Sequence, residues 1–509
     1  MSNTQREARD WWRSSAVDVP RFVTETPGPE SRRMHANTAK YMKGLSSQVQ
    51  LFPVAFQCGK GCTLTDVDGL GYTDFCLGDT GAMFGHSPPP VVEAIERQAG
   101  RGLTYMLPTE DAIAVGRLLE ERFGLPHWQV ATTATDANRF ALRVARAVTG
   151  RPKILVFNGC YHGTVDETFV RLVDGSAVNR PGLLGQVTDL TQLARVVEFN
   201  DLAALRAALA HGDVACVIAE PVMTNSCMVL PEPGFHAELR RLTRAAGTLL
   251  LIDETHTIST GPGGYTRALG LEPDLFVVGK PVAGGVPASV WGFTDEVAQR
   301  LDVVRSQTPP GHSGMGTTLS ANALSLAAMR ATLEHVMTDA AYRHMERLAG
   351  LLAEGLQATI AARRLPWHVV RVGARVEFVC APGPLRNGTQ AEAAHAPALE
   401  QALHLALLKF AHTAPRQEQV VELIVGGALV TAGLASALPG DARLERLSID
   451  YARGGTLEMH VVARDAAAWD RLIAQLERSP DFREVAPGTE TRDAEVRSAI
   501  RARWAGGAR

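Results

Sequence analysis

Residues 250–287 decide the fold of this chain and read LLIDETHTISTGPGGYTRALGLEPDLFVVGKPVAGGVP. An uninterrupted apolar run, Leu249–Ile252, ends at Asp253, and a second run, Leu275–Val278, is followed after one glycine by Lys280. Short apolar runs without polar alternation are typical of strands that are buried on both faces of a parallel sheet. We therefore predict two such strands, with a carboxylate and an amine at their carboxyl ends, where open α/β sheets bind ligands.

One carboxylate and one amine at neighbouring strand ends suit a particular cofactor. Pyridoxal phosphate (PLP) carries a ring nitrogen that an anion stabilises and an aldehyde that reacts with a lysine. Asp253 and Lys280 supply these two groups. The ordinary alternatives are an aspartate that caps a turn and a lysine that is solvated in a loop.

The same stretch resembles the class III aminotransferases of PLP-dependent fold type I, especially the branch with glutamate-1-semialdehyde aminomutase. That family carries a strand followed by Asp-Glu, and a later strand ending in Gly-Lys before a glycine-rich loop with proline. The resemblance implies an α/β fold: a large domain with a mostly parallel sheet of the seven-stranded type, and a small α/β domain. It also implies that Asp253 pairs with the pyridine nitrogen. Lys280 would form the Schiff base and then move protons.

A phosphate site is predicted at the start of a helix. Gln129–Ala131 indicates a strand, and an amphipathic helix follows as far as Thr149. The free N–H groups and the positive dipole end of a helix start suit a phosphate. The intervening Thr133–Ala137 resembles the Ser-Gly-Thr-Glu-Ala of the family. The resemblance places Ala134 and Thr135 at the cofactor phosphate, and an ordinary capped helix is the alternative.

Two further strand ends carry predicted cofactor contacts. The run KILVFNGCYHG indicates a strand that ends at Tyr161 and His162, and the resemblance stacks the aromatic ring of this Tyr-His-Gly motif on PLP. A buried strand, Val214–Glu220, runs into the family pattern Glu-Pro-Val-x-x-Asn. By that resemblance Asn225 lies near the phenolic oxygen of the cofactor, and Glu220 supports the site.

Two residues beside Asp253 depart from the family. Thr255 stands where Val usually packs under the cofactor ring, and His256 stands where Gln or Met is usual. His256 either helps to hold the substrate or the phenolic oxygen, or is a solvated or core histidine. Residues 313–329 resemble the family pattern Gly-Thr-x-Ser-Gly-Asn-Pro, in which Thr318 matches a threonine that reaches the phosphate of the neighbouring subunit. The resemblance therefore implies a homodimer with shared active sites.

The usual substrate contact of the resembled branch is missing. Its aminomutases and β-amino-acid transaminases hold a substrate carboxylate with an Arg just after position 43. No Arg lies between Met34 and Glu96, and Gln48 or Gln50 stands at the matching place. Because a bidentate guanidinium is the preferred partner of a carboxylate, glutamate-1-semialdehyde is a poor candidate. An amine, an amino sugar or an acid held in another way remains.

The domain boundaries follow from the same patterns. We predict residues 1–75 as the N-terminal segment of the small domain, 76–330 as the large PLP-binding domain and 331–414 as the small domain. Residues 415–509 lose the family resemblance. They resemble the ferredoxin-like domain of inner-membrane platform proteins of type IV pili and type II secretion. A fusion, a mis-joined reading frame and a divergent small domain are the open interpretations.

Four local predictions concern the smaller parts of the chain. The run CTLTDVDGLGYTDF indicates a hairpin around Asp68-Gly69. Ser87 is a candidate cap for a helix that prolines open. Helices are expected to about Arg364, followed by one strand over Val369–Cys380.

Composition limits the possible partners. The chain of 509 residues is 46% hydrophobic, which is enough for two or more domains. The net charge of -3 gives no support for binding to nucleic acid or to an anionic membrane. Seven scattered cysteines and a polar N-terminus without a signal-peptide core predict a cytoplasmic protein. The membrane-like run Val420–Leu438 contains Glu422, which favours a buried segment.

These observations predict a PLP-dependent aminotransferase. It would move an amino group from a small-molecule amine or amino acid donor to a keto acid or aldehyde through the Lys280 Schiff base. The first alternative is a glutamate-1-semialdehyde-type aminomutase, which needs no second substrate. The second is a non-catalytic protein of PLP fold that works by binding, against which the intact pair of Asp253 and Lys280 argues.

Overall fold

The computed structural model describes residues 27–41, 54–395, 399, 442–450, 456–478, 482–488, 491–492 and 496–504. The chain divides into two compact units. Of the described residues, 59–62 and 75–394 belong to the first unit, and 27–41, 54–58, 63–74, 395, 399 and those from 442 onward belong to the second. The membrane-like run 420–438 lies outside the described residues. The domain boundaries expected at residues 75, 330 and 414 stay predictions.

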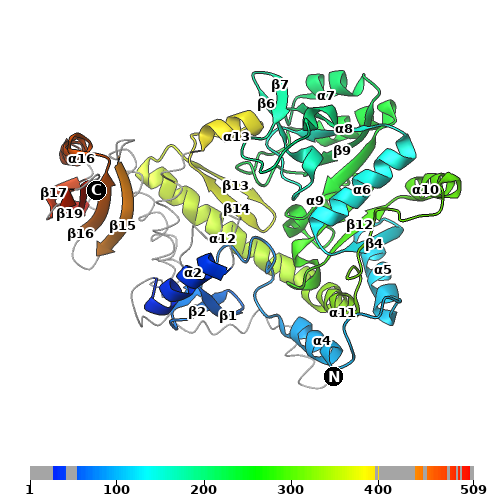
Figure 1. Cartoon of the computed structure of the whole chain (residues 1–509), viewed down its shortest axis with the longest axis horizontal. Helices are drawn as coiled ribbons and strands as arrows, with labels where there is room; N and C mark the ends of the chain where they lie inside the picture. Colours follow the sequence, from blue (N-terminus) through cyan, green and yellow to red (C-terminus); the bar gives the residue numbers. More distant parts are fainter. Residues whose placement is uncertain are drawn as a thin grey trace. The chain divides into compact units, whose positions relative to one another are not determined.

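A seven-stranded sheet forms the centre of the first unit, in the order β4-β12-β11-β10-β9-β5-β8 (Figure 1). Only β12 runs against the others, since its pairs with β11 and β4 are antiparallel and the remaining pairs are parallel. The mostly parallel sheet is thereby confirmed. Its strands are β4 (His127–Ala131), β5 (Lys153–Phe157), β8 (Ala194–Val197), β9 (Val214–Ala219), β10 (Leu249–Asp253), β11 (Leu275–Val278) and β12 (Ser289–Phe293).

Helices cover both faces of this sheet. The core on one face includes residues of α6, and the core on the other includes residues of α7 and α8. The helices of the unit are α4 (Pro89–Ala99), α5 (Glu110–Phe123), α6 (Ala134–Thr149), α7 (Leu202–Leu209), α8 (Phe235–Ala246), α9 (Gly264–Ala268), α10 (Asp295–Gln307), α11 (Ala323–Ala331), α12 (Asp339–Arg363) and α13 (Gly388–Ala394). Short helical turns are η2 (Asp166–Thr168), η3 (Leu190–Gln192), η4 (Thr257–Thr260), η5 (Lys280–Ala283) and η6 (Thr332–Val336).

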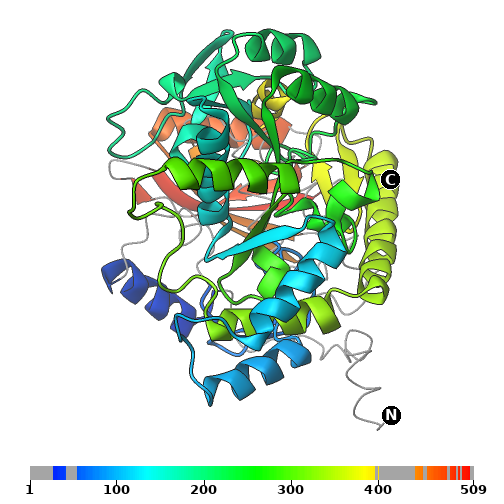
Figure 2. The same ribbon diagram turned by 90° about the vertical axis from the view of Figure 1, so that its right-hand side faces the viewer.

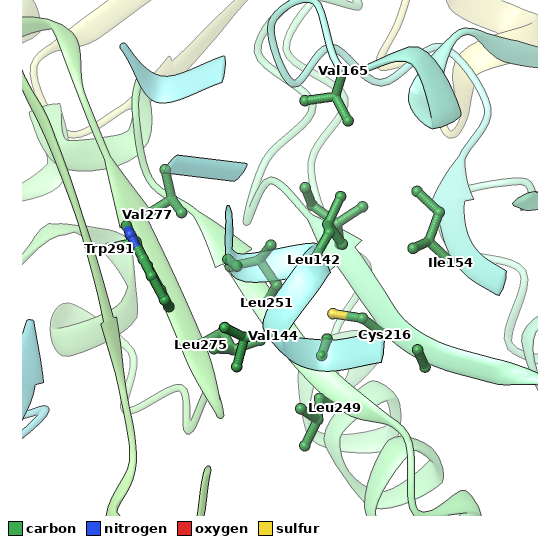
Figure 3. Packing of buried hydrophobic residues seen from close by; sticks show 14 of the residues in the cluster. Leu142, Val144, Ile154, Val165, Cys216, Leu249, Leu251, Leu275, Val277 and Trp291 are labelled. Carbon is green, nitrogen blue, oxygen red and sulfur yellow. The ribbon is translucent and has the colours of Figure 1, made fainter. Parts of the chain in front are cut away.

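Burial on both faces explains the apolar run of β10. Leu251 packs in the same cluster as Leu142 of α6, as Figure 3 shows. Its neighbours Leu250 and Ile252 point to the opposite face and pack with Leu239 of α8. Successive side chains of a strand point to opposite faces, so a strand covered on both sides needs an apolar residue at every position. The continuous run is a consequence of this burial.

A hairpin replaces the single strand predicted over Val369–Cys380. The structure has β13 (His368–Val372) and β14 (Arg375–Val379), which pair in antiparallel register. The single-strand prediction was wrong because the chain reverses at Gly373, whose φ is +55°. A Cβ at this position would lie 2.4 Å from the Cα of Thr260, so the turn needs a glycine. Figure 2 shows the long helix α12 beside the hairpin, and helix–strand contacts join them.

Smaller elements complete the first unit. Strands β6 (Val170–Val173) and β7 (Ser176–Asn179) form a second hairpin. The prolines open α4 as predicted, but Ser87 does not cap it. The N-cap is Pro88, and the Ser87 hydroxyl donates instead to the carbonyl of Gly59 at 2.9 Å. Proline has no side-chain oxygen, so Pro88 provides no side-chain cap.

The second unit contains the predicted N-terminal hairpin, with α2 (Pro29–Tyr41), β2 (Thr63–Asp66) and β3 (Gly71–Thr73), and β1 (Phe56–Lys60) runs from this unit into the first. Asp66 is fully buried and accepts hydrogen bonds from the backbone of Leu70 and the Tyr72 hydroxyl, each at 2.8 Å. Asp68 accepts from two backbone N–H groups at the start of α2, Glu30 and Ser31, also at 2.8 Å. The turn acids therefore fix both the hairpin and the helix start.

The C-terminal part of the second unit forms a sheet with one helix. The elements are β15 (Ala442–Asp450), β16 (Thr456–Ala463), α16 (Ala466–Arg478), β17 (Phe482–Pro487), β18 (Thr491–Arg492) and β19 (Val496–Trp504). Asp465 caps α16, because its carboxylate accepts from the backbone N–H of Ala468 at 2.8 Å. The resemblance of residues 415–509 to a platform-protein domain stays a prediction. Among the described helices, none has the length and apolarity needed to cross a membrane.

Candidate active site

The carboxyl ends of the sheet strands open into a cavity of about 350 Å³. Nine of the predicted site residues line it, each at the end of a strand or a few residues after one: Ala134, Thr135, Tyr161, His162, Glu220, Asp253, Thr255, His256 and Lys280. Asn225 and Thr318 are exposed and are not among the lining residues. Their expected contacts, with the phenolic oxygen of the cofactor and with a neighbouring subunit, stay predictions.

Asp253 is a buried anion in a hydrogen-bonded cluster. Its Oδ2 lies 3.0 Å from Nδ1 of His162 and accepts from the side-chain amide of Asn138 at 2.9 Å. Its Oδ1 accepts from the backbone N–H of Thr255 at 3.1 Å. Burial alone would raise the pKa of Asp253, but the hydrogen bond and charge of His162 and the bonds from Thr255 and Asn138 lower it to about 2.

His162 is the cation of this buried pair. Burial opposes its charge, while the neighbouring Cys160 and the hydrogen bond with Asp253 raise the pKa of His162 to about 10. The pair holds a fixed negative group at the base of the cavity at neutral pH. Asp253 is only 4% exposed, so its anion has little contact with water. The hydrogen-bond partners compensate for this loss of hydration.

Glu254, the next residue, serves the fold. It is fully buried, and its carboxylate accepts from the Thr257 hydroxyl at 2.6 Å and from the backbone N–H groups of Tyr265 (3.1 Å) and Thr266. Burial raises the pKa of Glu254. Its oxygens therefore anchor the loop after β10, whereas the adjacent Asp253 faces the cavity.

A cradle of main-chain groups lies at the start of α6. Thr133 caps this helix, because its hydroxyl accepts from the backbone N–H of Asp136 at 3.2 Å. The Thr135 hydroxyl accepts from the backbone N–H of Thr164 at 3.1 Å and so joins the cradle to the loop after β5. That loop needs Gly163, whose φ is +76° and whose Cβ would lie 2.1 Å from Thr135 Oγ1. The first N–H groups of the helix are left to bind an anion.

Lys280 has an unusual backbone conformation. Its φ is +45°, a region that residues with a Cβ rarely adopt. Such strain gathers at functional sites, where the surrounding structure enforces it. The conformation aims the Lys280 amine at two partners: Oδ2 of Asp79 at 2.6 Å and Nε2 of His256 at 2.8 Å.

His256 connects this amine to other polar groups. Its Nδ1 lies 2.9 Å from the Thr80 hydroxyl and 3.3 Å from Nη1 of Arg375. Burial and the charges of Lys280 and Arg375 lower the pKa of His256 to about 3, so the ring is neutral. A neutral imidazole has one acceptor nitrogen, and Arg375 can only donate. The charged Lys280 amine is also only a donor, so the single acceptor nitrogen of the ring can serve one of the two cations but not both.

Four of these polar residues were not predicted from the sequence. Asn138 could have been found, because it is a polar residue on the buried face of an amphipathic helix. Asp79 and Thr80 lie in an irregular loop at positive φ and gave no such signal. Arg375 was missed because its segment was interpreted as one continuous strand, which gave no reason to place Arg375 near the site.

The comparisons with known proteins agree with this geometry. The family model described as "Aminotransferase class-III" matches residues 45–381. The chain belongs to the class-III aminotransferases. A glutamate-1-semialdehyde 2,1-aminomutase of Anaeromyxobacter sp. (strain Fw109-5) is 34% identical over 385 residues, which are 74% of this chain and 88% of the relative.

Solved structures of this family have the same fold. A glutamate-1-semialdehyde-aminomutase from Pseudomonas aeruginosa PAO1 is 48% identical, covers 80% of this chain and 94% of its own, and has a TM-score of 0.75. A second structure of that protein is in complex with PMP. An omega-transaminase from Sphaerobacter thermophilus is 25% identical and has a TM-score of 0.71. The match covers 80% of this chain and 98% of the transaminase.

The class-III aminotransferase described here is a PLP-dependent enzyme of the aminotransferase and aminomutase type. Its cavity residues fit this cofactor. A buried anion, an amine and a main-chain anion cradle line one cavity. Two oxygens of lining residues, Oγ1 of Thr255 and Oε1 of Glu220, are buried without a hydrogen-bond partner in the described part of the chain. The family match ends at residue 381, before the C-terminal sheet.

Proposed function

We propose that this enzyme moves an amino group between a small-molecule amine or amino acid donor and a keto acid or aldehyde acceptor, with Lys280 and Asp253 as catalytic residues. The observation that carries the proposal is that the Lys280 amine and the buried Asp253–His162 pair line one cavity. When PLP is bound, it supplies an electron sink for the bonds of the amine-bearing carbon.

The side chains of the cavity divide this work. Asp253, held as an anion by His162, would keep a ring nitrogen protonated. The start of α6, with Ala134 and Thr135, would bind the phosphate. The Lys280 nitrogen would bond to the cofactor and then take and return a proton at the substrate carbon.

The remaining lining residues would hold the ring of the cofactor. Tyr161 is 43% exposed and lines the cavity, so its ring is available for stacking. Thr255, His256 and Glu220 would contact the ring and its substituents. The roles of Asn225 at the phenolic oxygen and of Thr318 at the phosphate of a partner subunit rest on the family resemblance.

An aminomutase is the second candidate, because curated relatives with 34% and 35% identity are named glutamate-1-semialdehyde 2,1-aminomutases. The test is to supply the PLP-loaded enzyme with one amino substrate, with and without a 2-oxo acid. A transaminase stops after converting one equivalent of donor per site and resumes when the oxo acid is added. Continued isomerisation of a single substrate without an oxo acid would contradict transamination and establish the mutase.

We also propose a cytoplasmic homodimer with shared sites. The seven cysteines are odd in number and scattered through the sequence, as expected of a reducing compartment. Thr318 is exposed, and apolar side chains at Tyr105, Met106 and Leu107 are exposed on one loop. Light scattering should give twice the chain mass. Mixing Lys280→Ala with Thr318→Val should restore activity that neither variant has alone, and no restoration would contradict sharing.

A further inference from the structure

Arg375 lies beside the cavity residue His256, and its polar partners differ from those of two other partly buried arginines of the first unit. Arg240 and Arg195 are partly buried, and each donates two hydrogen bonds to one aspartate at 2.7 or 2.8 Å. Arg375 is half-buried, yet no ion pair within the described residues includes it. A guanidinium out of bulk water without an anion is costly, so this cation has unused capacity to bind one.

The present contacts of Arg375 are weak. Nη2 donates to the carbonyl of Thr224 at 3.4 Å, and Nη1 lies 3.3 Å from Nδ1 of His256. Both distances exceed the usual range for such bonds. The Nε of Arg375 is buried and makes no hydrogen bond to any described residue. A carboxylate would satisfy this planar donor set better than one carbonyl and one imidazole do.

The position of Arg375 relates it to the reacting amine. His256 separates the two, with Nε2 at 2.8 Å from Lys280 Nζ and Nδ1 at 3.3 Å from Arg375. Among the described residues that line the cavity, Lys280 is the only lysine or arginine, so no other lining cation of this kind meets an incoming anion. The nearby acids do not take this role, since Asp79 contacts Lys280 and Glu220 accepts from Thr224.

We propose that Arg375 binds the carboxylate of the substrate and selects amino acids whose amine and carboxylate lie several carbons apart. The span from Lys280 to Arg375 holds an imidazole ring with a hydrogen bond at each end, whereas one carbon separates the two groups in an α-amino acid. Arg375 is thus a specificity-determining residue. This inference rests on the proposed amino-group transfer.

The experiment compares acids with matched neutral amines on the full-length PLP-loaded enzyme. The probes are β-alanine, 4-aminobutyrate and 5-aminopentanoate, each against propylamine, butylamine or pentylamine. For each probe, we would measure the concentration that gives half of the maximal change in cofactor absorbance, with no acceptor present. In the unmodified enzyme at least one acid should act at lower concentration than its amine. Arg375→Met should raise that concentration roughly 10- to 100-fold more for the acid than for the matched amine.

Two control variants separate recognition from folding. Arg371 lies on the paired strand of the same hairpin and donates to the carbonyls of Gly373 and Glu346, so Arg371→Met should leave the preference for acids intact. Arg375→Lys keeps the charge and should retain part of the preference. An acid preference that survives Arg375→Met, or the absence of any acid preference in the unmodified enzyme, would overturn the proposal.

A binding measurement keeps this proposal distinct from the proposed function. Butanoate carries the carboxylate but no amine, and calorimetry gives its affinity for the loaded enzyme without any reaction. Arg375→Met should weaken this binding by the same factor as it weakens the acid donor. Amines that never change the absorbance would refute amino-group transfer, while butanoate binding that depends on Arg375 would still support the anion site. Equal butanoate binding by both proteins would refute it.

Discussion

The two sides of the cavity are built in different ways. On the cofactor side, Asp253 is the last residue of β10, and Thr135 and His162 lie a few residues after β4 and β5. These residues are held by one another and by main-chain groups. On the substrate side, Lys280 contacts Asp79 directly and is linked to Arg375 through His256. Asp79 comes from a loop, and Arg375 comes from a separate hairpin. The first side is rigid and follows from the sheet. The second is assembled from distant segments and is where this chain can differ from its relatives.

The largest effect is expected from removing the amine on which both sides depend. Lys280→Ala should lower the rate of the half-reaction by roughly 10⁴-fold, because it removes both the nucleophile and the proton carrier. Single-turnover absorbance measurements test this. Lys60 is exposed at the end of β1, and Lys60→Ala is the matched control, which should react normally.

Two adjacent acids sharpen the comparison on the cofactor side. Asp253→Asn should reduce kcat by roughly 10²- to 10³-fold, because it removes a preorganised buried charge. Glu254→Gln should change kcat little but cost about 1–3 kcal/mol of unfolding free energy, because the backbone N–H groups of Tyr265 and Thr266 lose a charged acceptor. Kinetics and chemical denaturation measure the two effects. A stability loss for Asp253→Asn without a kinetic one would reverse these roles.

The cradle for the phosphate can be tested with two glycines. Gly163 and Gly212 have φ of +76° and +72°, so an alanine at either costs about 1 kcal/mol of backbone strain. Only at Gly163 would the new Cβ strike another group, Thr135 Oγ1 at 2.1 Å, whereas nothing lies within 4 Å at Gly212. Gly163→Ala should therefore weaken PLP binding about tenfold more than Gly212→Ala does. A tenfold difference in Kd corresponds to about 1.4 kcal/mol of binding free energy. Fluorescence titration of the apo-enzyme with PLP would reveal equal affinities if the cradle were elsewhere.

The smallest effect is expected at His256. Since burial, Lys280 and Arg375 lower its pKa to about 3, the ring is already neutral at pH 5 and stays so as the pH rises. His256→Gln should leave the shape of the pH profile of kcat unchanged between about pH 5 and 9, with a rate change of less than about tenfold. A profile measured for both proteins decides this. The loss of an acidic limb in the variant would show that His256 titrates during the reaction.

The cofactor side could be predicted because its residues are fixed by neighbours in the sequence. Leu250 and Ile252 pack on one face and Leu251 on the other, so the apolar run marks β10 and the next residue, Asp253, reaches the strand end. The same logic located Lys280 after β11. Asn138 was within reach of this reasoning, as a polar residue on a buried helix face.

The substrate side could not be predicted because it depends on a turn and on contacts between distant segments. One continuous strand over Val369–Cys380 gives no reason for Arg375 to lie beside His256. The reversal at Gly373 makes it the first residue of β14 and brings it within 3.4 Å of the Thr224 carbonyl. The local sequence of residues 373–375 does not indicate that Arg375 will contact Thr224 and His256.

The most direct test of this account is the absorbance spectrum of the purified full-length enzyme with PLP, before and after adding an amine donor without an acceptor. The account predicts a visible band that depends on Lys280, is absent from Lys280→Ala, and moves to shorter wavelength when a donor is added. A protein that takes up no PLP, or a band that persists in Lys280→Ala and ignores every donor, would contradict the assignment of Lys280 and Asp253 as the catalytic pair.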